Sequence, residues 1–182
     1  GTDLADKITV KEIREASKQT LYLMPAFFDV LAEFFIDILD INDTQNVFFT
    51  RHLINFIFFY ISCFFFYLII LEIFNNKIYS IIGVLYLFFY PRIFGESFYN
   101  NKDIIFLSCS IILIFFSIKY LKKQNYLNAF LFGAASGLAF DIRIMALIQI
   151  LTVYFIFFLK ILDSKSFLQE KYTHLFLSII TT

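Results

Sequence analysis

The residue types best suited to chemistry gather in one short stretch, from Tyr90 to Asp103, which reads Tyr-Pro-Arg-Ile-Phe-Gly-Glu-Ser-Phe-Tyr-Asn-Asn-Lys-Asp. It contains two cations, Arg92 and Lys102, and two carboxylates, Glu96 and Asp103. An arginine presents a planar, two-pronged donor and a lysine presents a point charge, and both side chains bind phosphate. The pattern therefore predicts a site for an anionic group.

An apolar run lies on each side of this stretch, from Ile78 to Tyr90 and from Ile104 to Leu121. Ionisable groups next to hydrocarbon cost free energy unless they face a wet cavity or pair with one another. Their concentration in one loop between two spans favours a functional site. The alternative hypothesis is that they are ordinary anchors at the membrane interface.

The composition indicates the class of protein. Of 182 residues, 60% are hydrophobic and 16% are charged, whereas soluble domains average about 45–50% apolar and about 25% charged residues. We therefore predict an all-α, polytopic transmembrane protein. The formal net charge is zero, which argues against nucleic-acid binding through bulk charge. Cys63 and Cys109 lie inside apolar runs and are expected to be buried thiols rather than metal ligands or disulfide partners.

Residues 51–182 are predicted to form a transmembrane domain of about five spans. The second span, Ile78–Tyr90, would give roughly 20 Å of helix at about 1.5 Å per residue, which is short of the ~30 Å hydrocarbon core. Either this helix continues past Pro91 or the charged loop dips into the membrane, and both alternatives place the loop at bilayer depth. Another apolar run starts at His174 and stops with the sequence, so we interpret the chain as a fragment with a sixth span cut off. The five predicted spans are Leu53–Leu71, Ile78–Tyr90, Ile104–Leu121, Tyr126–Phe140 and Ile144–Leu159.

Residues 1–50 are predicted to form an extracytoplasmic region. An amphipathic helix is expected over residues 26–41, where Asp29, Glu33 and Asp37 recur every fourth residue and so share one face. Such a helix should lie along the membrane interface with its acids toward water. The alternative is an ordinary surface helix.

The lysines set the expected orientation, because cytoplasmic loops carry an excess of Lys and Arg. If all five spans cross, the loop Pro91–Asp103 and the turn Asp141–Arg143 lie outside together. The fourth span contains Gly133-Ala-Ala-Ser-Gly137, a small-residue pattern that favours close helix packing. The predicted cytoplasmic lysines are Lys77, Lys119, Lys122, Lys123, Lys160, Lys165 and Lys171, and the outer cations are Arg92, Lys102 and Arg143.

These outer cations suit a lipid phosphate held at the membrane surface, with its tail in the hydrocarbon. Glu96 and Asp103 are expected either to hold a divalent cation or to orient the cations, and Asn101 to bind a sugar hydroxyl. The pattern indicates an anionic head group and leaves the reaction open. The predicted phosphate ligands are Arg92, Lys102 and Arg143.

The same stretch also resembles a known family. Pro91–Ile104 is similar to the Pro-Arg-aromatic and Asn-x-Lys-Asp loop of bacterial multi-pass proteins related to the dolichyl-phosphate-mannose–protein mannosyltransferases. Leu21–Asp29, followed by Arg51-His-Leu-Ile-Asn55, resembles the first extracytoplasmic segment of that family as it enters the next span. Gly133–Arg143 resembles its glycine-rich helix, which ends in a basic residue. The resemblance covers about residues 21–145.

The resemblance implies part of a GT-C glycosyltransferase fold in the bacterial cytoplasmic membrane, with an extracytoplasmic active site. It implies transfer of a sugar from a polyprenyl-phosphate donor to a protein, lipid or glycan acceptor. Lys102 and Asp103 match the basic and acidic positions of the second outer loop, and Arg143 matches the basic end of the glycine-rich helix. The family's general base lies after an earlier span with no counterpart here, so the catalytic residue is unassigned and the fragment is expected to be inactive alone. No cofactor is expected apart from the divalent cation.

Two other functions fit the sequence. A transporter or flippase fragment for an anionic or amphipathic substrate would also place charges at membrane depth, but it favours broken helices and inverted repeats, and we find no internal repeat. A structural membrane protein without chemistry has little use for four charges in one outer loop. A membrane glycosyltransferase is therefore the leading hypothesis.

Overall fold

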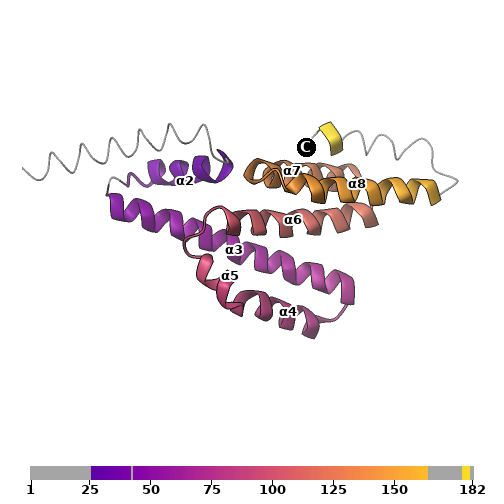
Figure 1. Ribbon diagram of the computed structural model, residues 1–182, viewed down its shortest axis with the longest axis horizontal. Helices are drawn as coiled ribbons and strands as arrows, with labels where there is room; N and C mark the ends of the chain where they lie inside the picture. Colours follow the sequence, from indigo (N-terminus) through magenta and orange to yellow (C-terminus); the bar gives the residue numbers. More distant parts are fainter. Residues whose placement is uncertain (1–25, 42, 164–177, 181–182) are drawn as a thin grey trace, which may run out of the picture.

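The structure is a computed structural model that describes residues 26–41, 43–163 and 178–180, and its elements in these ranges are helices. Figure 1 shows the longer helices running along the length of the molecule, with α3 between α4 and α6 and with α7 and α8 beyond α6. This arrangement confirms the all-α fold class. The helices are α2 (Ala26–Ile38), α3 (Thr44–Phe74), α4 (Lys77–Phe89), α5 (Pro91–Glu96), α6 (Asp103–Lys122), α7 (Tyr126–Ile142) and α8 (Ala146–Asp163).

Two of these helices, α3 and α6, are long and apolar enough to cross a membrane. Helix α3 has 31 residues and begins at Thr44, well before the predicted span start at Leu53. It ends at Phe74, and the left-handed backbone of the next residue, Asn75 (φ 50°), turns the chain toward α4. Helices α4, α7 and residues 146–160 of α8 are shorter apolar helices. The five-span arrangement therefore stays a prediction.

The chain breaks at the boundary between α4 and the charged loop. Helix α4 ends at Phe89, Tyr90 is extended, and Pro91 opens the separate six-residue helix α5. A proline disfavours helical backbone in the residue before it but fits the first helical position. An unbroken continuation of the second span past Pro91, one of the two alternatives considered above, is therefore wrong.

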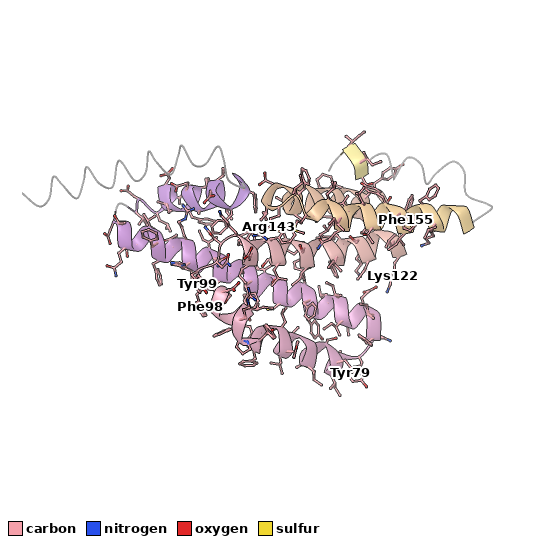
Figure 2. The ribbon with its side chains drawn as sticks, in the orientation of Figure 1. Tyr79, Phe98, Tyr99, Lys122, Arg143 and Phe155 are labelled. Atoms are coloured by element: carbon pink, nitrogen blue, oxygen red, sulfur yellow. The ribbon has the colours of Figure 1, made fainter. Side chains whose placement is uncertain are left out.

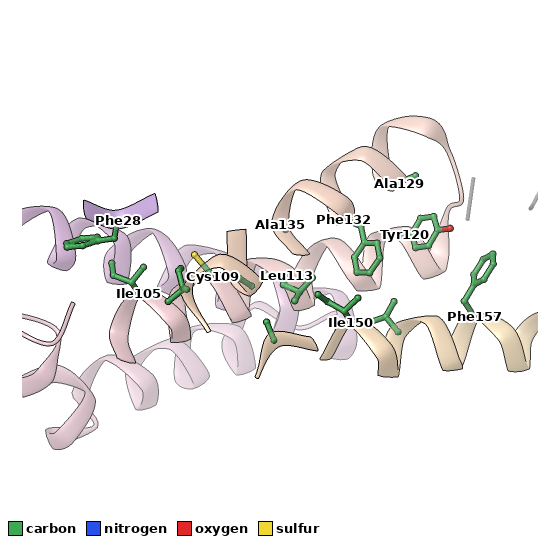
Figure 3. Packing of buried hydrophobic residues seen from close by; sticks show 14 of the residues in the cluster. Phe28, Ile105, Cys109, Leu113, Tyr120, Ala129, Phe132, Ala135, Ile150 and Phe157 are labelled. Atoms are coloured by element: carbon green, nitrogen blue, oxygen red, sulfur yellow. The ribbon is translucent and has the colours of Figure 1, made fainter. Parts of the chain in front are cut away.

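The main core lies along α6. Ile105, Cys109 and Leu113 of α6 are buried against α7 and α8, and Figure 3 shows this packing from close by. Helix α7 meets α6 through small buried side chains, Ala135 and Ala139 among them. Small residues let two helices approach closely, so the small-residue pattern predicted for this span marks a real packing face.

Large apolar side chains also cover the outside of the bundle. Tyr79 of α4 and Phe155 of α8 are 57% and 61% exposed, and Figure 2 shows side chains of this kind along the helices. An extended apolar exterior is unusual for a soluble protein and suits contact with lipid. Cys63 and Cys109 are free and buried, as expected.

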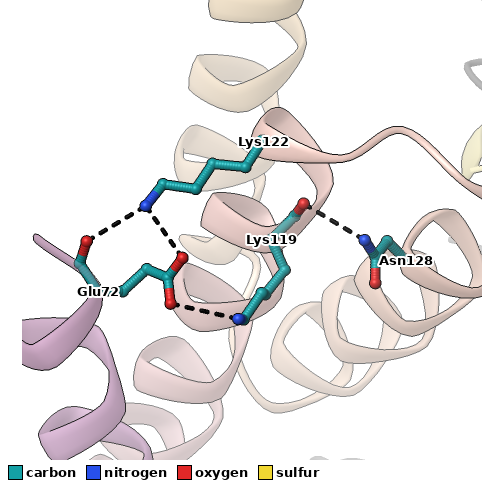
Figure 4. A network of polar contacts seen from close by, with 4 residues as sticks. All are labelled: Glu72, Lys119, Lys122 and Asn128. Carbon is teal, nitrogen blue, oxygen red and sulfur yellow. Dashed lines mark hydrogen bonds and ion pairs between the residues drawn. The ribbon is translucent and has the colours of Figure 1, made fainter.

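The lysine-rich turns gather at one end of the bundle (Figure 4). Glu72, near the end of α3, accepts hydrogen bonds from Lys119 Nζ at 3.2 Å and from Lys122 Nζ at 3.0 Å. Lys160 Nζ of α8 donates to the Leu121 carbonyl at 2.6 Å. The predicted shared end is thus confirmed for these three lysines. Lys165 and Lys171 lie outside the described residues, and the side of the membrane stays a prediction.

Helix α2 forms where an amphipathic helix was predicted, but two of the three acids on its acidic face, Asp29 and Glu33, are not turned to water. Asp29 and Glu33 both form ion pairs with Arg51 of α3. Helix α2 therefore runs beside the first turns of α3, roughly along the length of the bundle (Figure 1). The prediction of water-facing acids is wrong for Asp29 and Glu33, because an arginine eighteen or more residues away binds their carboxylates. The helix ends at Ile38, shortly before Asp40 takes a positive φ of 47°.

Candidate functional site

The end of the bundle opposite the lysines carries a continuous polar network. It joins α5, the loop after it, the start of α6 and the end of α7, and Figure 2 places Arg143 near Phe98 and Tyr99 of this region, away from Lys122. The network alternates cations with carboxylates around a central amide, so its charges are matched. In order, its members are Arg92, Glu96, Asn100, Asp103 and Arg143.

Asn100 is the hub of this network. Its Nδ2 donates to Glu96 Oε2 at 3.2 Å and to Asp103 Oδ2 at 3.1 Å. Its Oδ1 accepts from the backbone N–H of Asp103 at 3.0 Å and from that of Lys102 at 3.3 Å. The side chain thus caps the first turn of α6 and bridges two carboxylates at once. One residue fixes both the helix start and the position of the acids.

Asp103 and Arg143 meet although forty residues separate them. They form an ion pair between the start of α6 and the residue that follows α7. The Arg143 guanidinium also stands 5.8 Å from the centroid of the Phe106 ring, within cation–π distance. This contact confirms that the two charged turns predicted to share a surface come together. Both side chains stay well exposed, Asp103 at 48% and Arg143 at 42%, so ligands can reach them.

The structure shows which cation each acid of the network binds. The sequence left open whether Asp103 holds a divalent cation or orients one of the outer cations, and its carboxylate binds Arg143 and Asn100. Glu96 likewise binds Arg92, with Nε to Oε1 at 3.1 Å. Within the described residues no three metal-ligating side chains converge. The geometry therefore favours the second role considered for these acids, which is to orient cations.

Arg92 and Lys102 face solvent at this end. The Arg92 side chain is 80% exposed, and its hydrogen bond to Glu96 together with the carboxylate's charge raises the pKa of the guanidinium above its ordinary value. Lys102 is exposed and, among the residues that the structure describes, its ammonium group has no ion-pair partner. The charges within the network balance, so Lys102, which lies beside it, adds a positive charge that no described carboxylate neutralises.

Asn101, predicted to bind a sugar hydroxyl, lies half-buried beside the hub. Its backbone N–H bonds to the Tyr99 carbonyl at 3.1 Å, and its side chain makes no hydrogen bond within the described part of the chain. Its amide is thus available to a ligand, and its proposed role stays a prediction. The hub is the neighbouring Asn100, whose role was not predicted from the sequence. The sequence feature that could have indicated this role is the Asn-x-x-Asp spacing at a helix start, a common capping arrangement.

A second cluster, also missed from sequence, fixes α2 to the same end of the bundle. Arg51 binds Asp29 and Glu33, and all three side chains are less than a quarter exposed. At the first turn of α2, Asp141 Oδ2 accepts from the Phe27 N–H at 2.9 Å, as an N-cap supplied from α7. Asp141 lies two residues before Arg143, so α2 borders the network.

The loop after α5 also contacts α3 through a hydrogen bond and a pair of stacked rings. Asn55 of α3 is buried and donates from Nδ2 to the Ser97 carbonyl at 2.9 Å, just past the end of α5. Phe56 and Phe98 stack next to it with ring centroids 5.0 Å apart. Asn55 falls within the first predicted span, so the loop packs against the beginning of that span. These contacts with α3 hold the loop that carries the network in place.

Comparison with known families supplies the remaining observation. The family model described as dolichyl-phosphate-mannose-protein mannosyltransferase matches residues 23–182. The chain belongs to this family. The match includes α2, the charged loop and the turn after α7, which are the elements that build the network. No curated protein and no solved structure matches the chain significantly.

Family membership confirms the resemblance found in the sequence and identifies the chain as a membrane glycosyltransferase in general terms. It also agrees with the span-length apolar helices α3 and α6 in an integral membrane protein. The transporter hypothesis gains no support from it. The family match does not assign roles to individual site residues.

Proposed function

We propose that this protein transfers a sugar from a polyprenyl-phosphate donor to an acceptor on the extracytoplasmic face of a membrane. The family description, which names a lipid-phosphate-linked mannose and a protein, supports this class of donor and acceptor. The observation that carries the proposal is the polar network at the end of the bundle opposite the lysine-rich turns, with Lys102 beside it. In the proposed orientation it offers a positive charge to a lipid phosphate at the membrane surface.

Lys102 is the proposed first ligand of the donor phosphate. Its charge is not neutralised by any described residue, and it precedes the N-terminus of α6, where the helix dipole adds positive potential. As the sugar leaves, negative charge grows on the phosphate oxygen that bridged it. A fixed cation there stabilises the transition state more than the ground state.

Arg143 is the proposed second ligand. Its ion pair with Asp103 uses one side of the guanidinium, and an arginine has five N–H donors, so donors remain for a phosphate. Asp103 and the Phe106 ring restrict where the guanidinium can point. An arginine oriented in advance loses less entropy when it binds an anion.

Arg92 is the proposed outermost ligand, and Glu96 holds it. Asn101 is the proposed contact for a sugar hydroxyl because its amide has no partner among the described side chains. We propose no general base. The carboxylates Glu96 and Asp103 bind arginines, and Asp141 accepts a backbone N–H.

The test is donor turnover in membranes that contain the full-length protein. Membranes are given a panel of radiolabelled polyprenyl-phosphate hexoses, and release of polyprenyl phosphate is followed. Lys102→Ala should lower the rate by about 10²–10³, the loss typical of removing one preorganised charge-stabilising group. Lys102→Arg should restore part of the rate because it keeps the charge.

Lys123→Ala is the matched control, because Lys123 is an exposed lysine just past the other end of α6. It should leave turnover unchanged. Equal turnover by Lys102→Ala and the control, at equal expression, would remove Lys102 from the site. Absence of turnover of every lipid-phosphate sugar by the unaltered full-length protein would refute the proposed donor class.

A further inference from the structure

The end of the bundle opposite the network carries an excess of positive charge. Lys119 and Lys122 of α6 share the carboxylate of Glu72 there (Figure 4), and Lys160 of α8 binds the Leu121 carbonyl. Among the side chains that the structure describes in residues 70–79, 119–128 and 156–160, Glu72 is the one carboxylate. Five lysines accompany it, which leaves an excess of four positive charges at this lysine end. They are Lys77, Lys119, Lys122, Lys123 and Lys160.

Two of these lysines, Lys77 and Lys123, form no ion pair within the described part of the chain. Lys77 begins α4, just after the turn that follows α3, and Lys123 is the residue after α6. Both side chains are exposed. The end of α6 is capped without their ammonium groups, because Asn128 Nδ2 donates to the Lys123 carbonyl at 2.7 Å. The two ammonium groups are thus open to an anion from outside the chain.

The apolar exterior of the bundle begins directly beside these lysines. Phe74 at the end of α3 and Ile78 in the first turn of α4 are exposed. Tyr79 and Tyr126 are exposed as well, and Figure 2 shows Tyr79 at the same end as Lys122. A tyrosine has an apolar ring and a polar tip, and it is enriched where membrane meets water. The free lysines therefore lie at the level where lipid headgroups meet hydrocarbon.

We propose that the lysine end binds the headgroup phosphates of anionic phospholipids, with Lys77 and Lys123 as its free ligands. The occupant is a lipid rather than a soluble phosphate, because its acyl chains can pack on the exposed Phe74 and Ile78 while its phosphate reaches the ammonium groups. The proposal adds a preference among membrane lipids to the orientation inferred from the lysines. It concerns the end away from the network and does not depend on the proposed function.

The expected preference follows from the number of charges. A lysine near an anionic membrane surface strengthens binding about fivefold, which is about 1 kcal/mol. Removing both free lysines should therefore lower the preference for phosphatidylglycerol over phosphatidylcholine at least fivefold. Glu72→Gln should have the opposite effect. It removes the carboxylate that holds Lys119 and Lys122, and it should raise the preference about fivefold.

The experiment counts the lipids that stay bound to the full-length protein. The protein is placed in nanodiscs of equal parts phosphatidylglycerol and phosphatidylcholine, released, and weighed with its bound lipids by native mass spectrometry. Phosphatidylglycerol should be enriched on the unaltered protein, and Lys77→Gln combined with Lys123→Gln should lower the enrichment at least fivefold. A phosphatidylglycerol with a diazirine next to its headgroup should give adducts within residues 73–79 and 119–127.

Two control proteins separate charge and position from other effects. Lys77→Arg combined with Lys123→Arg keeps both positive charges and should keep the enrichment. Arg92→Gln removes an exposed cation from the opposite end of the bundle, so it should leave the adducts at the lysine end unchanged. Both controls alter exposed side chains, as the test variant does.

Several results would overturn the proposal. Equal binding of the two lipids by the unaltered protein would show that the lysine end does not select anions. An enrichment that survives the double lysine-to-glutamine change, or adducts only at the network, would place the lipid elsewhere. Displacement of the bound lipid by glycerol phosphate in solution would assign the lysines to soluble anions. Binding of polyprenyl phosphate at Lys102 should not change in any lysine-end variant, so this proposal and the proposed function fail separately.

Discussion

Replacing Asn100 tests whether the network depends on its hub. Asn100→Ala removes the bonds to Glu96 and Asp103 and the cap on the first turn of α6. Losing an N-cap typically costs about 1 kcal/mol. The two bonds to carboxylates, discounted for their partial exposure, contribute about 1 kcal/mol more. The loop and the first turn of α6 should therefore lose roughly 2 kcal/mol of local stability.

Asn100→Asp separates the two functions of this side chain. An aspartate caps a helix as well as asparagine does, but it cannot donate to Glu96 or Asp103. It also places a third carboxylate within hydrogen-bond distance of the two present, at about 1 kcal/mol of repulsion for each pair in a watery environment. We therefore expect Asn100→Asp to be more harmful than Asn100→Ala.

Hydrogen exchange of the protein in nanodiscs measures the effect. The amides at the start of α6 should exchange about 10-fold or more faster in Asn100→Ala, since each 1.4 kcal/mol is a tenfold change in the opening equilibrium. Those at the far end of α6, near Lys119, should be unchanged. Donor turnover should fall in the order wild type, Asn100→Ala, Asn100→Asp. If Asn100→Asp behaved as wild type, capping alone would explain Asn100 and the bridging role would be refuted.

Two further predictions concern the surroundings of the site. Arg51→Gln leaves two little-exposed carboxylates without their cation and should destabilise α2 by about 1–2 kcal/mol, which hydrogen exchange should detect as faster exchange in α2 but not in α6. Adding Asp29→Asn to this variant should recover part of the loss. No change in α2 would contradict the assigned ion pairs. Single cysteines in a cysteine-free background should react with an impermeant reagent from outside at Glu96 but not at Lys122, because the lysines mark the cytoplasmic end; the reverse pattern would invert the topology.

The sequence alone predicted the class of fold and the family. Its apolar content indicated membrane helices, and an apolar helix in lipid satisfies its own backbone hydrogen bonds, so helices follow from composition without knowledge of tertiary contacts. The motif around Arg92 and Lys102 carried the family resemblance, which the match over residues 23–182 confirmed. Helix ends were less predictable. The start of α3 at Thr44 lies in polar sequence, where α2 packs beside it.

Partner choice was decided only in the tertiary structure. The sequence showed that Asp103, Lys102 and Arg143 belong to two charged turns, but an aspartate can pair with any cation within reach. Packing of α6 against α7 through their small residues sets Arg143 beside Asp103, and the backbone at the start of α6 places the Asn100 amide between two carboxylates. Asp29 and Glu33 follow the same rule: their spacing showed one acidic face, and only the antiparallel approach of α3 brought Arg51 to it. Ion pairs between distant segments depend on ångström-scale distances that sequence spacing does not encode, and for that reason the charges of this site were predictable and their partners were not.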